Sequence, residues 1–131
     1  MKQINTGISK KIITTVTLEK LASAVGSGTA DVFSTPMMVA LMENAAMNCI
    51  SEYLDEGETS VGTHMDVKHI SASPVGMQVY AIATVTGTEG RKVNFKIEAF
   101  DTAGKIGEAT HSRFVLLQDI FEAKAKAKLD A

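Results

Sequence analysis

The chain has 131 residues, a length that supports one domain with a continuous apolar core. Thirteen basic and fifteen acidic residues give a net charge of −2, which excludes the strongly basic surface typical of proteins that bind nucleic acid or anionic membranes. The single cysteine, Cys49, cannot form an intramolecular disulfide and suits a reducing compartment. No signal peptide and no run of about 20 apolar residues is present. We therefore expect one soluble, cytoplasmic domain over residues 1–131 that binds neither nucleic acid nor membrane.

The first part of the chain predicts one strand and one long helix. Residues 11–17 are rich in Ile, Val and Thr and predict a strand, and residues 18–25 predict a short helical turn. After a break at residues 26–29, Thr35 is a candidate N-cap and Pro36 suits the first helical position. Apolar residues then recur at helical spacing, so we expect the helix to run to about Leu54, before Gly57 ends it.

From Ser60 onward the apolar residues follow a period of two, which is typical of strands. Strict alternation places His69 on the same mostly apolar face as Val61, and Gly62 on the opposite face. Three further strands are expected up to residue 117, the last of them central in the sheet, with a solvated and frayed tail over about 121–131. The predicted architecture is α+β: a strand, a long helix, and four antiparallel strands in a meander.

Three residues carry the side chains of an acyl-transfer site: Thr35 a hydroxyl, Glu43 a carboxylate and His69 an imidazole. Eight residues of helix separate Thr35 from Glu43 by about 12 Å, too far for direct contact. Either His69 bridges the two side chains from the sheet, or the hydroxyl and the carboxylate that act together come from different subunits. The sequence leaves both arrangements open.

Each of these residues also has a purely structural interpretation. Thr35 could only cap the helix, Glu43 could be an exposed helix residue, and His69 could be a hydrogen-bonded core histidine. Gly62 within a strand suits a close approach of ligand or backbone, or else a plain bulge. Arg113 suits either a substrate anchor or a solvated sheet face. No His or Cys spacing is typical of a metal site, so we expect no metal.

The segments that carry these residues resemble the fluoroacetyl-CoA thioesterase-like family over most of the chain. The resemblance rests on Ser34-Thr35-Pro36-Met37-Met38, Glu43, Val61-Gly62-Thr63, His69 and His111-Ser112-Arg113, with intervals of 8 and 26 between the threonine, the glutamate and the histidine. It implies a hotdog fold, in which an antiparallel sheet of about five strands wraps one central helix. It also implies that Thr35, Glu43 and His69 are catalytic, that Gly62 binds the thioester carbonyl region, and that Arg113 contacts substrate.

The function expected from this resemblance is hydrolysis of a short or small acyl-CoA by a homodimer, with CoA as part of the substrate and no separate cofactor. The best-known member of the family has bulky aromatic lid residues before its threonine. Here that stretch is Gly26-Ser27-Gly28-Thr29, so we expect no large preference for a fluorinated acetyl group. Two alternatives are a non-catalytic acyl-CoA or acyl-carrier binding module and a hotdog dehydratase or hydratase. The dehydratase chemistry needs no threonine, which favours hydrolysis.

Overall fold

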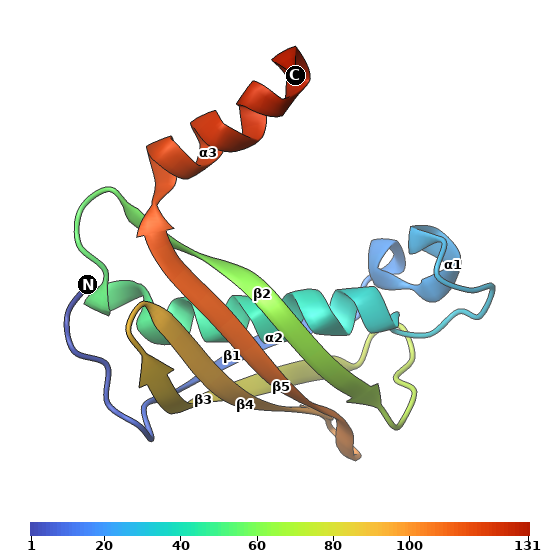
Figure 1. Ribbon diagram of the computed structural model, residues 1–131. Coiled ribbons are helices and arrows are strands. Elements are labelled where there is room, and N and C mark those ends of the chain that lie inside the picture. Colours follow the sequence, from blue (N-terminus) through green and yellow to red (C-terminus); the bar gives the residue numbers. More distant parts are fainter.

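A computed structural model describes residues 1–131, and Figure 1 shows an antiparallel sheet that curves around one long helix. The strands are β1 (Ser9–Thr15), β2 (Glu58–His69), β3 (Gln78–Glu89), β4 (Lys92–Asp101) and β5 (Gly104–Leu117). The helices are α1 (Ala22–Val25), α2 (Thr35–Ile50) and α3 (Gln118–Ala127), with short 3-10 turns at Leu18–Lys20, Ser51–Tyr53 and Lys128–Asp130. The predicted α+β class, the five strands and the single central helix are confirmed.

The order of strands in the sheet is β1-β3-β4-β5-β2, and every pairing is antiparallel. The predicted four-strand meander is therefore wrong for its first strand, because β2 pairs with β5 and not with β3. The connection from Ile70 to Met77 is longer than a hairpin turn and carries the chain to the other side of the sheet, where β1 occupies the free edge of β3. β5 is central, as predicted, and β1 and β2 are the two edges.

The N-cap of helix α2 lies one residue earlier than we expected, at Ser34 and not at Thr35. Ser34 is the N-cap, and its hydroxyl accepts a hydrogen bond from the Met37 N–H at 3.2 Å, so Thr35 is the first helical residue and not the cap. Proline follows within the first turn, where its missing N–H costs nothing. The side chains that α2 buries against the sheet are Met38, Leu41, Met42, Ala45, Ala46, Cys49 and Ile50. Because Ser34 satisfies the helix end, the Thr35 hydroxyl is free for other contacts.

A β-bulge in β2 changes which residues face the helix. In the pairing with β5, Gly62 lies opposite Arg113 and His64 lies opposite Ser112, so Thr63 is an extra residue. The bulge reverses the alternation, and Gly62 therefore faces α2 together with the later residues Met65 and His69. The prediction that Gly62 and His69 lie on opposite faces is wrong, because strict alternation does not survive a bulge.

The C-terminal segment forms a helix where we expected a frayed tail. α3 continues directly from β5 and has no buried residue, so the predicted exposure to solvent is correct but the predicted lack of structure is not. None of the helices combines the length and apolar character that a membrane crossing would need.

Candidate functional site

The first part of the site is a contact between the start of α2 and the end of β2. Thr35 Oγ1 lies 2.8 Å from His69 Nδ1, which is a hydrogen bond between the hydroxyl and the imidazole. His69 is the last residue of β2 and Thr35 the first of α2, so the pair joins two rigid elements. The other ring nitrogen, His69 Nε2, is buried and has no hydrogen-bond partner. A buried polar atom without a partner is uncommon and marks a place where another group binds.

The surroundings of this pair keep the imidazole in its neutral form. Burial lowers the pKa of His69 from its ordinary value of 6.5. Phe33, itself buried, packs edge-on against the imidazole with ring centroids 6.4 Å apart. A neutral imidazole that contacts a hydroxyl can accept that hydroxyl's proton.

A cavity of about 310 Å³ opens beside the hydroxyl and the imidazole. Its lining contains Ala22, Ser27, Val32, Phe33, Thr35, His69, Ile70, Ser71 and Ala72. Most of these side chains are small, and the segment before the helix contributes Ser27, Val32 and Phe33 to the wall. The cavity is at the low end of the range of small-molecule sites, which suits a short acyl group.

The second part of the site is a polar network around Glu43, farther along α2. Arg113 Nη1 donates to Glu43 Oε2 at 3.3 Å, and Arg113 Nε and Nη2 donate to the hydroxyl and the carbonyl of Ser60, both at 2.9 Å. Arg113 is only 5% exposed. Its donors are thus directed to protein groups, and one of them binds the carboxylate of Glu43.

His111 joins this network through hydrogen bonds at both of its ring nitrogens. Its Nδ1 lies 2.7 Å from the His64 carbonyl oxygen, which can only accept, and so Nδ1 carries the proton. Nε2 then accepts from Arg113 Nη1 at 3.2 Å. The ring is 2% exposed and stacks on Phe95 at 5.9 Å, and burial is the main cause that lowers its pKa. His111 is therefore a neutral imidazole with a fixed tautomer that helps to orient the Arg113 guanidinium.

Gly62 is the residue that makes room for the Glu43 carboxylate. A Cβ at this position would lie 2.5 Å from Glu43 Oε2 and 3.1 Å from His111 Cε1. Only glycine allows the strand to pass so close to the carboxylate. The bulge and the glycine together bring the β2 backbone against Glu43.

The structure thus brings the predicted residues together in two groups: Thr35 with His69, and Glu43 with Gly62 and Arg113. No hydrogen bond or ion pair joins the two groups. The bridging arrangement required Glu43 to bind His69, but Glu43 binds Arg113 instead. Within one chain the bridge is therefore wrong. The other arrangement, in which the carboxylate comes from a second subunit, agrees with the unpartnered Nε2.

The sequence analysis gave no role to two members of this network, Ser60 and His111, although His111 lies in a segment that carries the resemblance. His111 was visible as a residue two positions before Arg113 on the same face of a central strand. This position could have indicated that His111 takes part in the network, because a buried histidine on the same strand face as an arginine needs a hydrogen-bond partner for each ring nitrogen. The fixed tautomer could not be predicted, because it depends on the His64 carbonyl across the strand pair.

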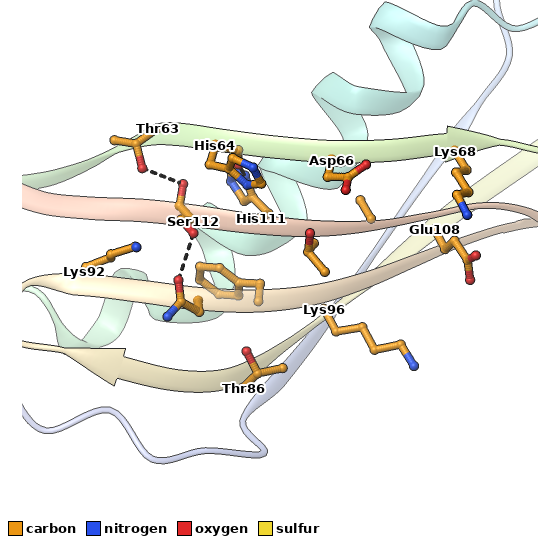
Figure 2. Close-up of a pocket in the computed structure, with 14 residues that line it drawn as sticks. Thr63, His64, Asp66, Lys68, Thr86, Lys92, Lys96, Glu108, His111 and Ser112 are labelled. Carbon is orange, nitrogen blue, oxygen red and sulfur yellow. Dashed lines mark hydrogen bonds between the residues drawn. The ribbon is translucent and has the colours of Figure 1, made fainter.

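A larger hollow, of about 880 Å³, lies elsewhere, on the face of the sheet away from α2 (Figure 2). Figure 2 shows Lys68, Lys92 and Lys96 together with Asp66 and Glu108 on this face. The lining is mostly polar and contains both signs of charge, and neither Thr35 nor His69 reaches it. We place the functional site at the smaller cavity because the paired hydroxyl and imidazole are there. No group of three or more His, Cys, Asp or Glu side chains is placed to hold a metal ion.

The chain is similar in sequence and in structure to fluoroacetyl-CoA thioesterases. Residues 16–119 match the family model described as fluoroacetyl-CoA-specific thioesterase. The fluoroacetyl-CoA thioesterase of Streptantibioticus cattleyicolor is 39% identical over 101 residues, which cover 77% of this chain and 73% of that protein. The crystal structure of the fluoroacetyl-CoA thioesterase FlK matches with a TM-score of 0.92 and 31% identity over 97% of this chain and 98% of the other.

A thioesterase superfamily member from Thermus thermophilus matches almost as closely in structure, with a TM-score of 0.91 and 29% identity over 99% of this chain and 96% of the other. The matches confirm the hotdog architecture, in which the sheet wraps the central helix. Because the family model spans most of the chain and the sequence identity extends over three quarters of it, the chain belongs to the fluoroacetyl-CoA-specific thioesterase family.

Proposed function

We propose that this protein is an acyl-CoA thioesterase that hydrolyses short or small acyl-CoA esters to the free acid and CoA. The observation that carries the proposal is the 2.8 Å contact between the Thr35 hydroxyl and a buried His69 whose second ring nitrogen has no partner. A hydroxyl on one side of an imidazole and an open position on the other are two of the three parts of a hydrolytic triad. Family membership supplies the reaction class.

In the proposed reaction His69 acts as the general base. Its Nδ1 accepts the proton of the attacking oxygen, which is Thr35 Oγ1 or a water bound against it, as that oxygen forms a bond to the thioester carbonyl carbon. The carbonyl oxygen gains the negative charge and is stabilised by backbone N–H groups, with Gly62 the candidate donor. The C–S bond then breaks, and the proton returns from His69 to the CoA thiolate. Water supplies the oxygen of the acid, directly or by hydrolysis of an acyl-threonine.

The carboxylate that completes the triad is proposed to come from a second copy of the chain. β2 is an edge strand, and an unpaired edge of this length favours pairing with another strand. In an antiparallel β2–β2 ladder with Asp66 at the two-fold axis, Met65 lies opposite Val67 and His64 opposite Lys68. Because Thr63 is the extra residue of the bulge, Gly62 is the next to pair and lies opposite His69 of the other copy.

This register joins the two groups of site residues. Gly62 contacts Glu43, so the ladder brings Glu43 of one copy toward the unpartnered Nε2 of His69 in the other. The Glu43 side chain is 42% exposed, and Arg113 binds its Oε2 but not its Oε1. A carboxylate that accepts from Nε2–H fixes the tautomer in which Nδ1 is the base. The proposed enzyme is thus a homodimer with two composite sites, and cytoplasmic location is a prediction from its single buried thiol.

The cavity indicates a short acyl group without strong selection for fluorine. Structures of FlK point mutants include one mutant in complex with acetyl-CoA and another in complex with fluoroacetate and CoA. In this chain α1 ends at Val25, its C-cap Gly26 has a φ of 79°, and the following residues offer no aromatic side chain before Phe33. One extra methylene changes selectivity by only about 1 to 3 kcal/mol even in a well-formed apolar site. We therefore propose similar kcat/KM for acetyl-CoA and slightly longer esters. A predicted contact of Arg113 with substrate stays a prediction.

The test is an assay of free thiol release over a panel of acyl-CoA esters that includes acetyl-, propionyl-, butyryl- and fluoroacetyl-CoA. Thiol release that disappears in the Thr35→Ala and His69→Ala variants supports the proposal. Binding of the esters without thiol release would identify a binding module, and addition of water to enoyl-CoA without thiol release would identify a hydratase. A preference for fluoroacetyl-CoA over acetyl-CoA above about a thousandfold would contradict the proposed selectivity.

A further inference from the structure

The C-terminal helix α3 stands away from the body of the molecule and has no partner in this chain (Figure 1). Leu117, Ile120 and Phe121 are 49%, 57% and 41% exposed. With Lys124 they follow the i, i+3, i+4, i+7 spacing of one helix face, so α3 carries an apolar stripe that is open to solvent. A helix of this length is marginally stable in water without tertiary packing. We therefore expect the apolar stripe of α3 to be stabilised by packing on another surface.

α3 starts at the end of β5, beside the first residue of the edge strand β2. Leu117 pairs with Glu58, the first residue of β2, and the Gln118 N–H donates to the Gly57 carbonyl at 3.0 Å. An apolar hollow of about 340 Å³ lies between α3 and the end of β5, and the only charged residues in its lining are Arg91 and Lys124. Figure 1 shows α3 on the side of β2 that no strand of this chain occupies.

A matching surface lies beyond the opposite end of β2. There a hollow of about 600 Å³ is lined mainly by apolar residues, among them Leu18, Leu21 and Val75, and its only charged residue is Asp31. Leu18 and Val75 are 71% and 46% exposed. This surface adjoins the Thr35–His69 pair, because Phe33 bonds through its backbone N–H to Ser73 next to Pro74. It cannot receive α3 of its own chain, since β2 separates them by about 36 Å at 3.3 Å per residue.

The antiparallel β2–β2 ladder brings the two surfaces together between copies. With Gly62 opposite His69 of the second copy, Glu58 lies about 13 Å farther on, past the end of the second copy's β2. That position is beside the second copy's Ile70–Gly76 connection. α3 extends about 15 Å from there, which is long enough to span the hollow. The apolar stripe ends with Lys124, and the apolar hollow contains Asp31, so the two surfaces carry opposite charges.

We propose that α3 is an intersubunit arm, whose apolar face packs on the Leu18–Val75 surface of a second copy of this chain and covers the flank of that copy's acyl cavity. This inference rests on the β2-paired dimer of the proposed function. In the dimer, each acyl cavity is bounded by α1 of its own chain and by α3 of the other. The arm would cover the side of the acyl cavity where the chain's own segment, Gly26–Thr29, has only small side chains.

The arm is tested with the full-length double variant I120E/F121E, with K126E as the matched control. Both change the charge of α3 by −2, but Lys126 lies on the opposite face of the helix from the stripe. Sedimentation velocity should show that I120E/F121E raises the dimer Kd at least about tenfold relative to wild type, whereas K126E leaves it unchanged. An unchanged Kd in I120E/F121E would overturn the arm.

A cross-link tests where the arm docks. Ile120→Cys and Val75→Cys variants are prepared separately and mixed, and the native Cys49 is buried. A disulfide-linked dimer in the mixture, absent from either variant alone, is the expected result, and failure to form it under oxidising conditions would overturn the proposed docking surface. Thiol release by the wild type is measured in parallel. A wild type that dimerises through α3 but hydrolyses no acyl-CoA would contradict the proposed function and leave the arm intact.

Discussion

The two groups of site residues differ in how completely their polar atoms are paired. In the Thr35–His69 group one imidazole nitrogen binds a hydroxyl and the other has no partner. In the Glu43 group, Arg113 donates four hydrogen bonds, to Glu43, His111 and Ser60, and every nitrogen of the His111 ring is engaged. The first group thus has an unpaired nitrogen, whereas hydrogen bonds between its own members hold the second group together. Substitutions should therefore affect activity in the first group and both activity and stability in the second.

The largest effect is expected from His69→Ala. Loss of the general base should lower kcat by at least about a hundredfold, while the melting temperature stays within a few degrees of wild type because His69 makes only one side-chain hydrogen bond. Steady-state thiol release and thermal unfolding measure the two quantities. A variant that loses its stability but keeps full activity in its folded fraction would show that His69 is only structural.

At Thr35, the Thr35→Ser variant should retain more thioesterase activity than Thr35→Ala. Equal losses of activity in the two variants would assign the threonine a packing role.

The next largest effect is expected from Arg113→Met. This change leaves the buried Ser60 carbonyl and His111 Nε2 without donors, and the free energy of unfolding should fall by about 2 to 4 kcal/mol. Activity should fall too, because Glu43 loses its partner. Arg91→Met is the control, since Arg91 also binds a glutamate, Glu58, at 2.7 Å but is half exposed. Urea denaturation should show a loss of less than about 1 kcal/mol for Arg91→Met. Equal stability of the two variants would contradict the supporting role of Arg113.

A smaller effect is expected from Gly62→Ala. The added Cβ would lie 2.5 Å from Glu43 Oε2, so the flexible carboxylate must move away. We expect kcat to fall about tenfold, with a loss of stability below about 1 kcal/mol because the end of a half-exposed side chain can yield. Gly87→Ala is a suitable control, because Gly87 also lies at a strand irregularity and has no atom within 4 Å of an added Cβ. Full activity of Gly62→Ala would show that the position of Glu43 does not matter.

The smallest effect is expected in pH dependence, and it separates the two histidines. Burial lowers the pKa of both His69 and His111 below their unfolded value near 6.5. Below pH 6.5 the unfolded chain binds protons that the folded chain does not, so stability falls with falling pH in that range and gains nothing above it. His111→Gln should reduce this slope and keep the acid limb of kcat/KM, whereas His69→Gln should abolish hydrolysis. Paired pH profiles of unfolding and hydrolysis measure both, and a shifted acid limb in His111→Gln would contradict the separation.

Much of the fold follows from local patterns in the sequence. The apolar spacing on α2, the proline in its first turn and the alternation in β3, β4 and β5 each act over a few residues, and all were predicted near their observed positions. The nearness of Thr35 to His69 follows from the same patterns, because a helix start and a strand end on the helix-facing side of the sheet meet at one end of the fold. Thr35, Glu43 and His69 were singled out by their spacing, which resembles that of the thioesterase family, and their catalytic roles stay a prediction.

The arrangement of the second group was decided only by tertiary structure. The bulge at Thr63 depends on the register between β2 and β5, and no local pattern in β2 encodes it. Without the bulge Gly62 would face away from Glu43. The pairing of β2 with β5 is likewise a contact between distant segments, which the strand pattern alone does not specify. The sequence by itself determined the central helix and the strands of the sheet, with α3 as the exception, and long-range strand register decided which side chains meet.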